Sequence, residues 1–209
     1  RFVFNHKGWN RVVGFHTRNV IHRVHEHIQL SALERCGADG LYVSPVIGPK
    51  KSGDFLPDPI MRSYQIMLEQ GLYPPGKVVL GSFATYSRYA GPREAVFTAL
   101  CRKNMGCSHF IVGRDHTGVG NFYGADEIPA LFDSLGDIGL TPVFFEAIGY
   151  DPVGKGYAAP GAAQTLTISG TEMREALRAG RALPDWFMRD IIQDMLRAEI
   201  SAGRPVFSE

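Results

Sequence analysis

The sequence predicts an α/β fold: a doubly wound, Rossmann-like parallel sheet followed by a small C-terminal helical lobe. Over the first 150 residues, short apolar runs alternate with longer segments of helical spacing, and consecutive parallel strands need such helical crossovers. After about residue 150 the alternation gives way to a stretch rich in Gly, Pro and Ala, which is typical of a loop or linker. We therefore expect one unit at residues 1–150 and a second, smaller unit at residues 151–209.

The strands are predicted from runs that are apolar at successive positions, such as "RVVGF" and "HFIVG", which is typical of strands buried between two helix layers. Five strands are expected, at residues 9–15, 40–48, 77–83, 108–113 and 141–150. Helices are expected between them, at residues 22–36, 60–70, 91–106 and 127–139. Gly37 can end the first of these helices, and Pro92 can begin the third. Beyond the linker at 151–164, further helices are expected within 165–180 and at 185–203.

The composition narrows the classes of function. The 209 residues suffice for one sizeable α/β domain, and 22 basic against 21 acidic residues leave a formal net charge of +1. A protein that binds nucleic acid by neutralising phosphates is usually more basic, so we expect no nucleic-acid partner and only local recognition of anions. No apolar run approaches the roughly 18 residues that span a bilayer, so we expect no membrane partner.

The cysteines predict a cellular compartment. The chain has three cysteines, which is an odd number, and they form no CxxC pair. They are Cys36, Cys101 and Cys107. This pattern is typical of reduced thiols, so we expect a cytoplasmic protein.

The chain begins without a methionine, and we expect it to be a processed chain or a fragment of a longer polypeptide. We also expect a homo-oligomer.

Three polar clusters fall where predicted strands lead towards helices: residues 16–25 ("HTRNVIHRVH"), 113–118 ("GRDHTG") and 168–174 ("ISGTEMR"). In open parallel sheets, ligands bind at these carboxyl ends of the strands. The N-terminus of a helix offers free N–H groups and a partial positive charge there, which suit phosphate. The three clusters together predict a nucleotide site.

His22 and His25 are three residues apart, so they share one face near the start of the first predicted helix. Two imidazoles there can donate hydrogen bonds to a polyphosphate and stabilise the charge of a leaving group. A pair of surface histidines without such a role is one alternative. A metal site that includes His27, as in a metal-dependent hydrolase, is another. Because the HExxH spacing is absent and the three histidines cannot all face one way, we expect no resident metal.

Arg18 lies in the loop between the first strand and the first helix, where it offers a planar fork for a tetrahedral oxyanion. A solvated surface arginine is the alternative. In "ISGTEMR", Thr171 is the expected N-cap residue and Glu172 lies early in the helix. That cluster serves the helix, a ligand or both.

These segments together resemble the ATP sulfurylase (sulfate adenylyltransferase) family of nucleotidyltransferases. "FHTRNVIHRVHE" is similar to the family signature F-Q-x-R-N-P-x-H-x-x-H, and "HFIVGRDHTGVG" is similar to its GRDHAG segment. "SPVIGPKKSGD", "RYAGPREA" and "ISGTEMREALRAGRALPDWF" resemble further family segments in the same order. The resemblance covers nearly the whole chain. It implies a nucleotidyltransferase catalytic domain at 1–150 and a C-terminal lobe that carries the ISGTxxR motif, without the PUA-like domain that usually precedes them.

The resemblance also implies a reaction and a role for each matching residue. AMP passes from Mg-ATP to sulfate or a related oxyanion, pyrophosphate leaves, and Mg²⁺ arrives with the ATP. The implied catalytic residues are Thr17, Arg18, Asn19, His22 and His25. The implied oxyanion ligands are His16, Arg18 and Thr117, and the implied nucleotide ligands are Asn19, His22, His25, Gly113, Arg114, Asp115, His116 and Ile148. The implied supporting residues are Ser169, Thr171 and Arg174.

Four residues depart from the family pattern: His16 stands for Gln, Val20 for Pro, Val24 for a small residue and Thr117 for Ala. Positions 16 and 117 belong to the implied oxyanion pocket, where His16 would add charge if it were protonated. A remodelled sulfate pocket, a different oxyanion and a loss of catalysis are all open. In the last case the domain would be a catalytically silent module for assembly or regulation, for example one fused to an adenylylsulfate kinase.

Overall fold

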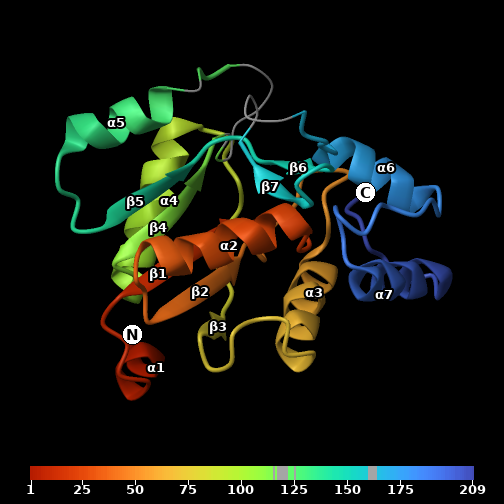
Figure 1. The fold of residues 1–209 in the computed structure, drawn as a ribbon, viewed down its shortest axis with the longest axis horizontal. Coiled ribbons are helices and arrows are strands. Elements are labelled where there is room, and N and C mark those ends of the chain that lie inside the picture. The colour runs from red at the N-terminus through yellow and green to blue at the C-terminus, as the bar shows by residue number, and fades with distance from the viewer. Residues whose placement is uncertain (115, 117–121, 125, 160–163) are drawn as a thin grey trace.

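The computed structural model of the chain describes residues 1–114, 116, 122–124, 126–159 and 164–209. Five parallel strands form the central sheet in the order β3-β2-β1-β4-β5 (Figure 1). They are β1 (Val12–Thr17), β2 (Gly40–Pro45), β3 (Val78–Leu80), β4 (His109–Gly113) and β5 (Thr141–Phe145). Each predicted strand position holds one of these strands, and the doubly wound α/β fold class is confirmed.

The strand order reverses at β1, which lies between β2 and β4. β1 pairs with β2 along its whole length, from Val12 to Thr17. With β4, among the described residues, it pairs only at Val13 and Gly14. The carboxyl ends of β1 and β4 are therefore free to diverge and leave room for a ligand between them. Doubly wound sheets bind their ligands at this kind of switch point.

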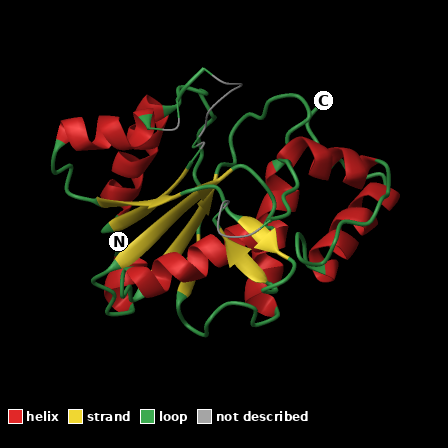
Figure 2. Ribbon diagram, turned by 45° about the horizontal axis from the view of Figure 1, so that its top comes forward, coloured by secondary structure: helices red, strands yellow, loops and turns green. Residues whose placement is uncertain are grey.

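Helices cover both faces of the sheet (Figures 1 and 2). They are α2 (Arg23–Arg35), α3 (Pro57–Glu69), α4 (Pro92–Met105) and α5 (Glu127–Leu135). α2 and α3 share one hydrophobic cluster with Val13 of β1, whereas α4 and α5 share a second cluster with Val12. Adjacent residues of one strand thus reach opposite layers, which explains why the strand sequences are apolar throughout.

The two C-terminal helices pack against each other, and the second of them packs against α3 (Figure 1). They are α6 (Gly170–Arg178) and α7 (Asp190–Ser201), and both were expected, although α7 begins later than residue 185. Met173 of α6 and Ile192 of α7 belong to the hydrophobic cluster that α2 and α3 build. The division of the chain near residue 150 stays a prediction. Within the described ranges, no helix combines the length and apolar character needed to cross a membrane.

Two segments differ from the prediction. A short helix, α1 (Phe2–His6), precedes the first strand, where no element is predicted. The predicted strand at 141–150 is in fact two strands, because the chain leaves the parallel sheet after Phe145. β6 (Gly149–Asp151) then pairs antiparallel with β7 (Gly156–Ala158), which lies in the stretch predicted as a linker. The glycine-rich sequence of that stretch thus includes the turn of a hairpin.

Candidate anion and nucleotide site

A cavity of about 390 Å³ opens at the carboxyl ends of β1 and β4. Its lining is Phe15, His16, Thr17, Arg18, Asn19, His25, Ile28, Ile111, Gly113, His116, Gly170, Thr171 and Arg174. The cavity thereby brings together residues from all three polar clusters singled out in the sequence. Asp115 and Thr117, two of the implied ligands, lie outside the described residues.

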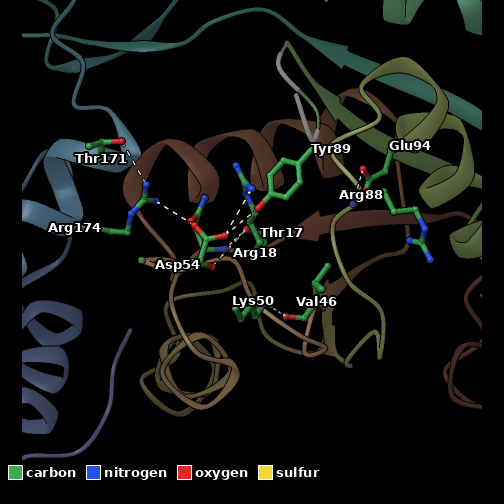
Figure 3. Close-up of polar contacts among 12 residues, drawn as sticks. Thr17, Arg18, Val46, Lys50, Asp54, Arg88, Tyr89, Glu94, Thr171 and Arg174 are labelled. Atoms are coloured by element: carbon green, nitrogen blue, oxygen red, sulfur yellow. Dashed lines mark hydrogen bonds and ion pairs between the residues drawn. The ribbon is translucent and has the colours of Figure 1, made fainter. Parts of the chain in front are cut away.

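Two arginines face one buried carboxylate beside this cavity (Figure 3). Arg18 Nη1 lies 3.7 Å from Oδ2 of Asp54, and Arg174 Nη1 lies 3.8 Å from Oδ1. The Tyr89 hydroxyl donates a hydrogen bond of 3.3 Å to the same carboxylate, and the Arg18 guanidinium lies 4.9 Å from the centre of the Tyr89 ring. Two cations around one carboxylate leave a positive charge that a bound anion would neutralise.

Asp54 is not among the site residues predicted from the sequence. This residue lies in the loop after β2, close in sequence to the cations Lys50 and Lys51. A lone acidic residue in a basic loop that follows a strand is the signal that could have identified it. Lys50 donates a hydrogen bond of 2.5 Å to the carbonyl of Val46. Burial lowers the pKa of the Lys50 ammonium group to about 8, although Asp54 acts in the opposite direction.

Thr17 and Asn19 shape the turn after β1. The backbone N–H of Asn19 donates a hydrogen bond of 3.1 Å to Oγ1 of Thr17. Oδ1 of Asn19 is shielded from solvent and has no hydrogen-bond partner in the described part of the chain. Val20, one of the four departures from the pattern that the resemblance implies, is fully buried in the core. Its side chain therefore contributes to the packing of the core and not to the polar groups of the turn.

His22 and His25 lie together, as their spacing predicts. The centres of the two rings are 3.8 Å apart, Phe187 stacks on His22 at 5.2 Å, and Phe15 meets His25 edge-on at 5.2 Å. His22 is the N-cap residue of α2, and the backbone N–H of Arg23 donates to the carbonyl of Phe187. These contacts hold both imidazoles at the positive end of α2.

Both imidazoles are neutral at physiological pH. Burial lowers the pKa of His22 to about 4. Burial, reinforced by His22, lowers the pKa of His25 well below its usual value. Nδ1 of each ring is shielded from solvent and lacks a hydrogen-bond partner among the described residues. Such a pair can donate hydrogen bonds to an anion without carrying a charge.

The geometry does not support a metal site on the histidine cluster. The His27 ring lies 5.2 Å from the Tyr157 ring, and its Nε2 lies 3.4 Å from Oγ of Ser31. Over the described ranges, no three His, Cys, Asp or Glu side chains gather closely enough to hold a metal ion. The Asp54 carboxylate, beside the cavity, is already engaged by two arginines.

The buried histidines make stability depend on pH. Folding lowers the pKa of His22 from 6.5 to about 4, so the unfolded chain binds a proton below pH 6.5 that the folded chain does not. Stability therefore falls as the pH drops from 6.5 towards 4, by about 1.4 kcal/mol per pH unit for each such histidine. We expect urea midpoints to decrease as the pH is lowered, and to decrease less in His22→Gln. A flat profile would contradict the expectation.

His16 lines the cavity and contacts a buried arginine. Arg102 of α4 places Nη2 2.9 Å from Nδ1 of His16 and also donates to the carbonyl of Ser44 at 2.8 Å. The His116 ring lies 5.2 Å from the His16 ring, and its Nε2 lies 2.9 Å from Oγ1 of Thr98. Burial above all, and then Arg102, lowers the pKa of His16 well below its usual value. His16 is therefore neutral and adds no positive charge to the cavity.

A second cavity, of about 540 Å³, lies at the carboxyl ends of β4 and β5. Gly113 and Arg114 belong to its lining, and Gly113 also lines the first cavity. The two cavities therefore meet at the end of β4, in the segment to which the resemblance assigns the adenosine. Ile148 packs half-buried against the hydrophobic core, directly after Ala147, which lines this second cavity.

Ser169 begins α6 with a capping box. Its hydroxyl accepts a hydrogen bond of 3.2 Å from the backbone N–H of Glu172, whose carboxylate accepts one of 2.7 Å from the N–H of Ser169. The prediction of Thr171 as the N-cap is therefore wrong, because Ser169 forms the reciprocal pair with Glu172. Thr171 instead lines the cavity and accepts a hydrogen bond of 3.4 Å from Arg174 (Figure 3).

The structure defines an α/β domain with a candidate anion site at the topological switch point of its doubly wound sheet. The site combines the stacked histidines at the start of α2 with the arginines around Asp54. Comparison with known proteins gives the particular family. The model of the family described as ATP-sulfurylase matches residues 1–199, and the chain belongs to that family.

Known relatives cover nearly all of the chain. It is 44% identical over 213 residues to a sulfate adenylyltransferase of Symbiobacterium thermophilum, a match that covers 98% of this chain and 53% of that protein. It is 45% identical over 203 residues to a probable bifunctional SAT/APS kinase 2 of Sorangium cellulosum, covering 94% of this chain and 34% of that protein. The chain thus spans about half the length of the first relative and about a third of the second.

The fold also matches a solved structure of a hexameric APS kinase from Thiobacillus denitrificans. The TM-score is 0.75, over 95% of this chain and 38% of that chain. Because the sequence identity is 22%, this match shows the fold alone.

Proposed function

We propose that this chain is the catalytic part of an ATP sulfurylase, which transfers AMP from Mg-ATP to sulfate or a related oxyanion and releases pyrophosphate. The observation that carries the proposal is the cavity lined by Arg18, Arg174 and His25 at the switch point of the sheet. Membership of the ATP-sulfurylase family supports it.

The cavity suits the chemistry of this reaction. An oxygen of sulfate attacks the α-phosphorus of ATP, a new S–O–P bridge forms, and the bond to the pyrophosphate oxygen breaks. Sulfate is fully ionised at neutral pH, so the reaction needs no general base. It needs two anions aligned for in-line attack and donors for the charge that moves onto pyrophosphate.

Residues in or next to the cavity can meet each of these requirements. Arg18 would bind the oxyanion, with Arg174 at its side, while Thr17 and Asn19 would support the phosphates. The neutral His22 and His25 would donate hydrogen bonds to the leaving pyrophosphate.

The nucleotide itself would bring the metal ion. Mg²⁺ would be held by the phosphates of ATP, where it neutralises part of their charge. Residues 1–150 would form the nucleotidyltransferase catalytic domain. Residues 151–209 would form the lobe that brings Thr171 and Arg174 to the cavity.

A catalytically silent module is the second candidate function. It is favoured by the departures from the family pattern in the oxyanion pocket, at positions 16 and 117. The relative named as a bifunctional SAT/APS kinase supports a fused or separate adenylylsulfate kinase as a partner under either function. Such a kinase would consume adenylyl sulfate, the product of the first candidate.

Pyrophosphate release tests the two candidates directly. We expect the 209-residue chain, supplied with Mg-ATP and pyrophosphatase, to release phosphate only when sulfate or molybdate is added. The preferred anion then shows what the altered pocket accepts. No release from a folded chain that binds ATP would overturn the first candidate and support the silent module.

A further inference from the structure

A buried arginine lies directly behind the candidate oxyanion pocket. Arg102 of α4 is 0% exposed. Its guanidinium carbon lies 4.1 Å from the centre of the Phe83 ring, and its Nη2 donates to the carbonyl of Ser44. Among the described residues it has no ion-pair partner, and its Nε and Nη1 have no hydrogen-bond acceptor. A buried cation without a carboxylate is costly and calls for a specific role.

The strand next to Arg102 is adapted to this side chain. A Cβ atom at Gly14 of β1 would lie 3.0 Å from Cγ of Arg102. Any larger residue at position 14 would therefore push against the arginine stem. Burial lowers the pKa of Arg102 only to about 10, so the guanidinium remains charged at neutral pH.

The contact between Arg102 and His16 fixes where the imidazole carries its proton. Nη2 of Arg102 lies 2.9 Å from Nδ1 of His16, and a guanidinium can only donate. Nδ1 must therefore supply its lone pair, so the proton of the neutral ring is on Nε2. Nε2 is shielded from solvent and has no acceptor within the described part of the chain, although His16 lines the cavity together with Arg18. A buried N–H group without an acceptor is unfavourable until a ligand supplies one.

We propose that Arg102 is a positioning residue that locks His16 in the tautomer protonated on Nε2, and that this N–H donates to an oxygen of the bound oxyanion. The second half rests on the proposed function. His16 then acts as a neutral hydrogen-bond donor, as the N–H of a side-chain amide would. Because its lone pair is used by Arg102, the ring cannot accept a proton from the ligand, so this position suits an oxyanion oxygen that carries no proton.

The surroundings of His16 keep the ring neutral. The ionisable groups around it come from four segments: Arg102, His116, Lys50 and Arg18, in order of decreasing effect, and each lowers its pKa in addition to burial. Within the described residues, none of the groups that act on this pKa is a carboxylate. The donor is therefore present throughout the neutral pH range.

Nitrogen-15 NMR of the ring nitrogens tests the tautomer without any turnover. We expect His16, assigned by the signal lost in His16→Gln, to show one protonated nitrogen, Nε2, and one unprotonated nitrogen, Nδ1, near pH 7. Arg102→Gln should release the lock and mix the two tautomers, whereas Arg102→Lys, which can still donate, should restore it in part. Arg93→Gln, an exposed substitution on the same helix, should change nothing. A ring protonated on Nδ1, or on both nitrogens, in the unaltered chain would overturn the proposal.

Kinetics test the link to the oxyanion. We expect Arg102→Gln to raise the KM for sulfate about tenfold or more, while the KM for ATP changes less than about threefold. In the His16→Gln background, the same substitution should have a clearly smaller effect, because no tautomer remains to be fixed. Equal effects in both backgrounds would overturn the donor role. If Arg102→Gln does not fold, the kinetic comparison is made with Arg102→Lys. The tautomer of His16 in the unaltered chain, measured by NMR, still tests the proposal. If the chain has no turnover at all, the NMR result judges Arg102 separately from the proposed function.

Discussion

Arg18→Ala is expected to abolish oxyanion-dependent pyrophosphate release while leaving ATP binding nearly intact. The guanidinium lines the cavity and lies against Asp54 and Tyr89, so its loss removes a planar cationic donor. Of the two arginines that face the Asp54 carboxylate, Arg174 then remains. A single preorganised donor of this kind contributes about 10²- to 10³-fold to turnover. We expect a loss of at least this size, measured as pyrophosphate release at saturating Mg-ATP.

The control separates a local effect from a general one. Arg62→Ala removes an exposed arginine that pairs with Glu69 on α3, away from the cavity, and should leave turnover unchanged. The dissociation constant of ATP in Arg18→Ala should stay within about threefold of the original value. Equal losses of ATP binding and turnover would show that Arg18 holds the nucleotide rather than the oxyanion.

The candidate site could be predicted from the sequence because its main elements are local. Strand ends and helix starts follow from apolar runs and spacing, and the N-terminus of α2 carries the stacked pair His22 and His25 that their separation predicts. The loops after β1 and before α6 also meet at the cavity, as ligand sites in doubly wound sheets do. These inferences need only the periodicity of the chain and the geometry of parallel sheets.

Contacts between distant parts of the chain could not be derived in this way. Asp54 becomes significant only because Arg18 and Arg174 approach it from two other segments. In the sequence, Arg102 cannot be told apart from an exposed arginine on a helix. Its contact with His16 spans 86 positions. The protonation state of His16 follows from that contact and from burial. It could not be predicted from the residue type alone.

The hairpin of β6 and β7 was missed for a related reason. Its strands are short and glycine-rich, and local propensity favours a loop there. The hairpin is held by long-range contacts instead: Tyr150 stacks on Trp186 at 5.3 Å, and the Tyr157 hydroxyl donates to the carbonyl of Trp186 at 2.5 Å. Trp186 precedes Phe187, so these contacts also support the aromatic ring against which His22 stacks.

His25→Ala is expected to lower kcat by about 10²- to 10³-fold with little change in the affinity for ATP. The ring lines the cavity at the positive end of α2, where it can donate to pyrophosphate as charge moves onto the leaving group. An interaction that strengthens in the transition state appears in kcat rather than in ground-state binding. His25→Gln keeps a neutral donor and should recover part of the loss, whereas His27→Gln, on another face of α2, should change little.

The pH profile decides whether the donor is neutral or charged. Because the pKa of His25 lies well below its usual value and that of His22 is about 4, both rings stay neutral as the pH falls from about 8 to about 6. kcat should therefore be nearly constant over this range. An imidazolium donor would instead lose its proton as the pH rises through its pKa, and kcat would fall towards pH 8. Such a fall, absent in His25→Gln, would show that ligand binding recharges the pair, and the neutral-donor mechanism would be wrong.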